Sequence, residues 1–275
     1  MPIGVAGPAT ALHQITAPLA AQGTAFEVHV YGSAAAARTG IENRAVYGAI
    51  VVTAGGPRLL VASAANPTVA GLLRSTASRL GGGRTIAVTD VVPAASRDPE
   101  GVGALTTLLP LVLLSVALGV VLAFVERRPR RLPVWCVAAS AVSGLAVSGV
   151  AAGLGTFPGS YWSNAGVLGL LVLGLCGTSA GLSAVALLRP LAGLVALTML
   201  FLGIPSAGAT VPPALLPQPW RAFGPYLPPG AAVDALRGLT FFGGAAVGGP
   251  LLVLTCWALI GLILLVAVPA RGSAH

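Results

Sequence analysis

Few side chains in this sequence could act as nucleophiles, acid–base groups or cofactor ligands. All 15 Lys and Arg residues are arginine, so the chain has no lysine for a Walker A phosphate loop, a Schiff base or pyridoxal chemistry. The segment Gly81–Arg84 therefore predicts a turn and not a phosphate loop. No GxSxG, HExxH or paired-carboxylate pattern occurs. The sequence indicates that the protein is not an enzyme, binds no cofactor and relies on another polypeptide for any ATP hydrolysis.

The cysteines and histidines do not form a recognisable metal site. They are Cys136, Cys176 and Cys256, and His13, His29 and His275. No CxxC pair occurs, so neither a zinc site nor a redox motif is indicated. The cysteines fall in apolar stretches and are expected to be small apolar packing residues, and the isolated histidines are expected to be structural or exposed.

The charged residues most suited to a functional role lie in the segment 209–246. Its first half is rich in proline and therefore rigid and non-helical. Residues 231–242 then predict a short amphipathic helix, in which Asp234 and Arg237 stand at i and i+3, close enough to pair. One interpretation is a re-entrant or interfacial element that gates the outer mouth, with Arg221, Asp234 and Arg237 at the pathway. The other is a helix on the bilayer surface that carries a solvated ion pair.

A second basic cluster occupies a short loop between apolar stretches. It consists of Arg127, Arg128, Arg130 and Arg131. Two roles are open for it: contact with a partner protein, or a topology determinant beside anionic lipid.

The composition places most of the chain in a lipid bilayer. Only 8% of the 275 residues are charged and 56% are hydrophobic, with a mean hydropathy of +0.91, whereas soluble domains carry about 25% charge. Runs of apolar residues predict five helical spans at about 104–125, 132–155, 165–188, 191–208 and 247–268. None has an ionisable residue at its centre, which argues against a self-powered ion-coupled carrier. The net charge of +8 gives no reason to expect a nucleic-acid partner.

The positions of the arginines predict an orientation. The loop 126–131, the turn 189–190 and the C-terminal tail carry six arginines and are expected to face the cytoplasm. Residues 1–103 would then form an extracytoplasmic domain, followed by a transmembrane domain over 104–275. The first eleven residues resemble no signal peptide, so we expect either that span 104–125 acts as a reverse anchor or that a first span is missing.

The first 103 residues predict an α/β domain. Alternating apolar residues and turn signals predict the order β-α-β-α-β-β-α-β. The two central strands, 47–53 and 58–62, are expected to form a hairpin, and the next helix to begin at Asn66-Pro67.

Small residues recur at helical spacing within the predicted spans. Ser140, Gly144, Ser148 and Ala152 are spaced by four, and Gly149/Gly153 and Gly177/Gly181 form GxxxG pairs. These positions predict close helix packing between spans or in a homodimer, although so many glycines and alanines also produce such spacings by chance.

Three stretches carry a resemblance to a known family: residues 46–73, with a strand, a Gly-Gly turn, a second strand and an Asn-Pro helix start; residues 90–113; and residues 227–244. They resemble ABC-2-type transporter permeases, in particular the actinobacterial YhgE/Pip-like membrane proteins. The resemblance implies an α-helical multi-span permease that exports a hydrophobic or amphipathic substrate as a dimer, with energy from a partner ATPase. For the loop that contains Arg127, Arg128, Arg130 and Arg131, it implies contact with this cytoplasmic ATPase subunit. Members of the family usually have six spans, with the outer domain between the first two. A membrane-anchored binding or scaffold protein is the alternative.

Overall fold

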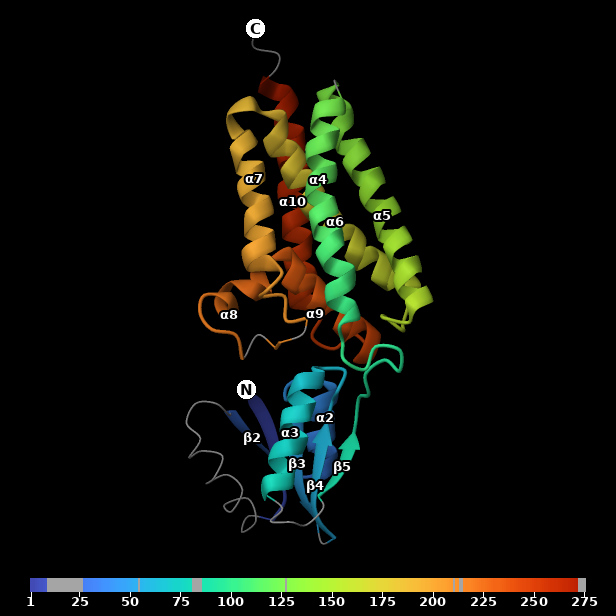
Figure 1. The fold of residues 1–275 in the computed structure, drawn as a ribbon, viewed down its shortest axis with the longest axis vertical. Helices are drawn as coiled ribbons and strands as arrows, with labels where there is room; N and C mark the ends of the chain where they lie inside the picture. Colours follow the sequence, from blue (N-terminus) through green and yellow to red (C-terminus); the bar gives the residue numbers. More distant parts are fainter. Residues whose placement is uncertain are drawn as a thin grey trace.

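The computed structural model describes residues 1–8, 27–53, 55–80, 86–126, 128–209, 211–212 and 215–271. A small α/β sheet domain is followed by a bundle of long helices (Figure 1). We call the end of the bundle beside this domain the sheet end and the opposite end the far end. The first helix of the predicted β-α-β-α-β-β-α-β order, the glycine turn at 81–84, His13 and His275 lie outside the described residues.

The sheet domain follows the predicted order of elements wherever it is described. It contains β1 (Pro2–Ala6), β2 (Glu27–Tyr31), α2 (Ala34–Glu42), β3 (Gly48–Thr53), β4 (Gly56–Val61), α3 (Pro67–Leu80) and β5 (Ala87–Asp90). The five strands lie in the order β2-β1-β3-β4-β5, and only the predicted β3–β4 hairpin is antiparallel. The Asn66 side chain accepts a hydrogen bond from the Val69 amide and so caps the first turn of α3, as its sequence predicts.

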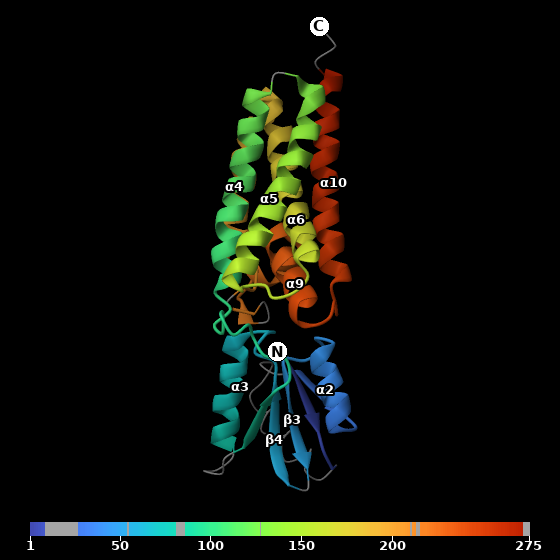
Figure 2. The same cartoon turned by 90° about the vertical axis from the view of Figure 1, so that its right-hand side faces the viewer.

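Among the described residues, each face of the sheet is covered by one helix, α2 or α3 (Figure 2). On one face Ile41 of α2 packs with Val46 and Val51. On the other face Val69 and Leu73 of α3 pack with Leu59. The central strands are therefore buried on both faces, which accounts for their nearly continuous apolar sequence.

In the part of the chain that the structure describes, five helices of the bundle are long and apolar enough to cross a membrane, as the sequence predicts. The bundle contains α4 (Gly103–Val125), α5 (Leu132–Leu154), α6 (Tyr161–Ala184), α7 (Arg189–Thr198) with a π-helical turn Met199–Gly203, α8 (Trp220–Phe223), α9 (Pro228–Phe241) and α10 (Gly248–Arg271). The third and fourth spans, Tyr161–Ala184 and Ala186–Gly203, begin four to five residues earlier than predicted.

Arg189 explains part of this shift. It does not separate two spans but opens α7, within the fourth of them. Its Nε donates to the Ser183 carbonyl at 3.1 Å, and its guanidinium lies 5.1 Å from the centre of the Phe124 ring. Arg189 can therefore begin the apolar helix α7, because its long side chain carries the charged head group to the C-terminal end of α6.

Helix α6 lies at the centre of the bundle and packs against α4, α5 and α10. Ser140, Gly144 and Ser148 are buried on the face of α5 that meets α6, whereas Ala152 is exposed. Gly177 and Gly181 lie against α10, but Gly149 and Gly153 face outward. The small residues 140–148 and the Gly177/Gly181 pair therefore pack helices within one chain, whereas the Gly149/Gly153 pair does not.

Candidate functional site

The segment between α7 and α10 turns back into the bundle. The Trp220 Nε1 donates to the Phe201 carbonyl at 3.3 Å and holds α8 against the π-helical turn. Pro228 and Pro229 occupy the first turn of α9, where a missing N–H costs no helical hydrogen bond. Helix α9 packs on α6 and α10 and is buried over most of its length.

The depth of this segment can be read along α10. The Trp257 Nε1 donates to the Tyr226 carbonyl at 3.0 Å. Trp257 lies about 14 Å along α10 from Gly248 at the sheet end, at 1.5 Å per residue. Helix α9 therefore starts about 14 Å into the bundle and runs back toward the sheet end.

Asp234 of α9 pairs with the sheet domain and not with Arg237. The Arg44 Nη2 donates to the Asp234 carboxylate at 2.8 Å, and its Nη1 donates to the Asp234 carbonyl at 3.1 Å. The Arg44 guanidinium also lies 5.6 Å from the centre of the Phe242 ring. The predicted i, i+3 pair is thus wrong, because a residue 190 positions away in sequence offers a better-placed partner.

Arg237 instead binds the unwound chain that follows α7. Its Nη2 donates to the carbonyls of Gly208 and Ala209, at 3.2 and 3.4 Å. Burial lowers the pKa of Arg237, the nearby Asp234 opposes this shift and Arg44 adds to it. An arginine nevertheless keeps its charge at neutral pH, so this cation is held by backbone dipoles at the base of the sheet domain.

We call Arg44, Tyr47, Asp234, Arg237 and Phe242 the domain junction. Phe242 is buried in the apolar core of the sheet domain, and Phe241 packs beside it. The backbone there is tight: a Cβ on Gly238 would lie 2.5 Å from the Val247 Cγ1. Apolar packing and ion pairing together attach the end of α9 to the sheet domain.

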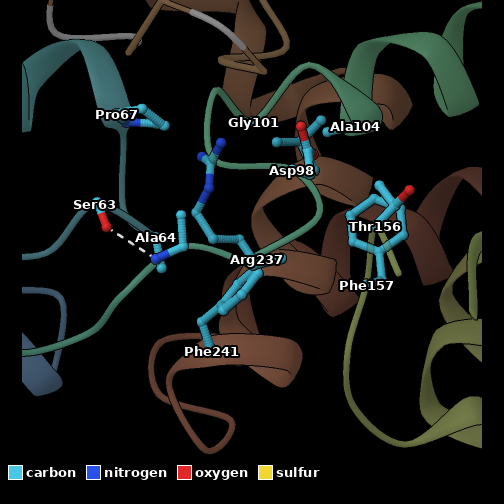
Figure 3. Close-up of a pocket in the computed structure, with 13 residues that line it drawn as sticks. Ser63, Ala64, Pro67, Asp98, Gly101, Ala104, Thr156, Phe157, Arg237 and Phe241 are labelled. Atoms are coloured by element: carbon cyan, nitrogen blue, oxygen red, sulfur yellow. Dashed lines mark hydrogen bonds between the residues drawn. The ribbon is translucent and has the colours of Figure 1, made fainter. Parts of the chain in front are cut away.

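A small cavity lies beside the domain junction (Figure 3). Ser63, Asp98, Thr156 and Arg237 contribute its polar lining, and its volume is about 40 Å³. Asp98 accepts hydrogen bonds from the amides of Val102 and Gly103 and so caps α4. This volume accommodates water molecules and is far below the several hundred Å³ of a small-molecule site.

The remaining predicted residues lie apart from the domain junction. Arg221 is exposed on α8. Arg128, Arg130 and Arg131 are exposed at the far end, and Arg127 lies outside the described residues. Cys136 and Cys176 are buried, whereas Cys256 is exposed. His29 lies 3.5 Å from Glu27, and no group of three metal-binding side chains occurs in the part of the chain that the structure describes.

Tyr47 gives the domain junction a testable response to alkaline pH. Burial raises the pKa of its hydroxyl above 10.0, the charge of Asp234 adds to the shift, and Arg237 and Arg44 oppose it. The neutral tyrosine thus stabilises the fold fully below the unfolded-state pKa, and this stabilisation is lost as pH rises through the folded-state pKa. We expect stability to fall above about pH 10 in the wild type and less in Tyr47→Phe, measured by thermal unfolding in detergent. Parallel pH profiles for the two proteins would contradict this.

Arg44 is a residue of the domain junction that the sequence does not reveal. It is one of seven arginines in the first 100 residues, and no local pattern distinguishes it. Only its positive φ of 61° and its contact with α9 do so.

Comparison with protein-family models, curated proteins and solved structures found no match to this chain.

Proposed function

We propose that this chain is the membrane permease subunit of an ABC-2-type exporter, which moves a hydrophobic or amphipathic substrate with energy from a partner ATPase. The observation that carries the proposal is the re-entrant α8–α9 segment between the last two candidate spans, bound to the sheet domain by Arg44 and Asp234. If α10 crosses a bilayer, α9 starts about 14 Å deep, near the middle of a hydrocarbon core about 30 Å thick. Such an element can open or close one mouth of a pathway.

The composition of the chain supports an energy source on another polypeptide. It has no lysine for nucleotide binding, and its spans have no ionisable residue near their centres. A partner that hydrolyses ATP supplies what the chain lacks. The exposed Arg128, Arg130 and Arg131 at the far end form the surface for that subunit.

The transport path in this proposal lies between two copies of the chain. The cavity at the domain junction is too small for an amphipathic molecule. Outward-facing apolar residues on α4 and α5, such as Leu114, Val142 and Val150, are more than half exposed in the single chain. A homodimer in the bilayer provides a pathway that one chain does not enclose.

The proposal places the sheet domain outside the cell membrane and the far end in the cytoplasm. A Val30→Cys variant, exposed on β2, should react with a membrane-impermeant maleimide in intact cells. An Arg130→Cys variant should react only after the cells are permeabilised. Both are made in a Cys256→Ser background, since Cys136 and Cys176 are buried. The reverse labelling pattern would overturn the orientation.

Partner capture tests the permease proposal itself. The detergent-solubilised, affinity-tagged chain should co-purify with an ATPase subunit from its native cells. We expect the Arg128→Gln/Arg130→Gln/Arg131→Gln variant to lose this subunit while its own thermal unfolding is unchanged, because all three side chains are exposed.

A matched charge deletion controls for net charge. The variant Arg38→Gln/Arg58→Gln/Arg74→Gln removes the same charge from exposed positions of the sheet domain and should retain the ATPase. If no ATPase co-purifies with the wild-type chain, the exporter proposal is refuted.

A membrane-anchored binding or scaffold protein is the second candidate. An open depression of about 380 Å³ beside the domain junction favours it, lined by Glu42, Thr240 and Phe242 among others. The Thr240 hydroxyl is buried there without a hydrogen-bond partner among the described residues. Capture of a partner by the sheet domain without any ATPase would support this alternative.

A further inference from the structure

The two buried cysteines lie on facing helices. Cys136 on α5 and Cys176 on α6 are each 0% exposed and belong to one apolar core. The third cysteine, Cys256, is exposed on α10 and separate from this pair.

The helix register places Cys136 and Cys176 opposite one another. A Cβ built on Gly144 would lie 2.5 Å from the Ala165 carbonyl oxygen and 2.8 Å from the Gly169 amide nitrogen, so the two backbones touch there. Helices α5 and α6 run antiparallel. The residues two turns before Gly144 on α5 therefore lie opposite the residues two turns after Ala165 and Gly169 on α6. Position 136 therefore faces positions close to 176.

The surroundings of the thiol pair decide between metal binding and disulfide formation. No group of three or more His, Cys, Asp or Glu side chains that could hold a metal occurs among the described residues. A structural zinc ion takes four such ligands. A disulfide needs only two thiols on closely packed backbones, and it adds no charge to the apolar core.

We propose that Cys136 and Cys176 form a reversible disulfide that joins α5 to α6. The oxidant is a lipid-soluble quinone: the two S–H bonds break, one S–S bond forms, and the two electrons and two protons reduce the quinone to the quinol. Reduction by a dithiol reverses the step. The inference does not depend on the transport proposal.

The position of the pair in the bundle suits this oxidant. Cys136 lies in the second turn of α5, about 6 Å from its first residue at the far end. Helix α5 is peripheral and packs mainly on α6, so opening its first turns exposes the thiols to the lipid phase without disrupting the rest of the bundle. A quinone dissolved in lipid meets them there, whereas a charged oxidant does not.

The test uses the full chain in lipid nanodiscs, in a Cys256→Ser background. Tetramethyl-benzoquinone is the probe, because its ring positions are blocked and it cannot alkylate thiols. We expect a loss of both maleimide-reactive thiols after denaturation in detergent, recovery of both with dithiothreitol, and a higher Tm for the oxidised protein. Peptide mapping should show a bond between the segments that contain Cys136 and Cys176.

Single-thiol variants make the result specific. Cys136→Ser and Cys176→Ser, in the same background, should each keep their one thiol after quinone treatment. Retention of both thiols in the Cys256→Ser protein, with quinone and with the general thiol oxidant diamide, overturns the proposal. A disulfide-linked dimer on a non-reducing gel, without the internal bond, also overturns it.

Discussion

Replacing Arg44 with alanine is expected to weaken the attachment of the sheet domain to the bundle by about 2–3 kcal/mol. Hydrogen bonds to charged groups contribute about 1.5–3 kcal/mol, and the loss leaves the Asp234 carboxylate without its partner. The side chains of Arg44 and Asp234 are 16% and 36% exposed, so water only partly replaces the pair. Hydrogen–deuterium exchange at the end of α9 and after α2 should become faster.

Because Arg44 has a left-handed backbone conformation, substitutions there can distinguish the contribution of its side chain from that of backbone strain. The residue follows the end of α2 with φ of 61°, and the amides of Arg44 and Ala45 donate to the carbonyls of Ile41 and Gly40. This is the left-handed position of a Schellman motif, which usually holds glycine. A non-glycine residue there costs about 1–2 kcal/mol, so Arg44→Gly should be less destabilising than Arg44→Ala by about that amount.

A salt bridge on the same helix provides the control. Arg38 and Glu42 pair at 2.9 Å, but both side chains are largely exposed, and Arg38→Ala should cost less than about 1 kcal/mol. A double-mutant cycle over Arg44→Ala and Asp234→Ala should show a coupling on the order of 1–3 kcal/mol. Additive effects, or equal effects of Arg38→Ala and Arg44→Ala, would show that the pair does not hold the domains together.

The dependence of the domain junction on distant residues explains what the sequence could and could not predict. Five apolar runs predict five spans because the length of each is set by the bilayer, and alternating residues predict the β3–β4 hairpin because side chains alternate across a strand. The partner of Asp234 has no such local signal. Arg237 lies one turn from Asp234 in α9, but Asp234 binds Arg44 and Arg237 binds the Gly208 carbonyl.

A re-entrant element and a helix on the bilayer surface are the two interpretations that the composition of α9 leaves open. Prolines and interfacial aromatics are common to surface helices and to re-entrant segments, so they do not distinguish the two. The bond from Trp257 to the Tyr226 carbonyl and the burial of Ala231, Ala232 and Ala235 show that α9 packs inside the bundle, which favours the re-entrant interpretation. Small residues on α9 allow it to pack between neighbours, and this is the signal that an analysis of charge alone overlooks.

The second large expected effect concerns the contact between α5 and α6, where small residues let the two helices approach closely. Gly144→Ala should destabilise the bundle by about 2 kcal/mol, since the new Cβ would meet the backbone of Ala165 and Gly169 and not flexible side chains. Separation of the two helices is the only relief, and it exposes the buried Ser140 and Ser148 on either side. Thermal unfolding in detergent and the proteolysis rate of the α5–α6 connection measure this change.

Gly153→Ala is the matched control, because it makes the same substitution near the end of the same helix. A Cβ at Gly153 meets nothing within 4 Å, so only the lower backbone entropy of the unfolded chain matters, and this variant should be stabilised by about 0.5–1 kcal/mol. The two variants should therefore differ by about 3 kcal/mol with opposite signs. If Gly153→Ala is the more damaging variant in a bilayer but not in detergent, that face of α5 packs against a second copy of the chain, and the contact within one chain is the weaker constraint.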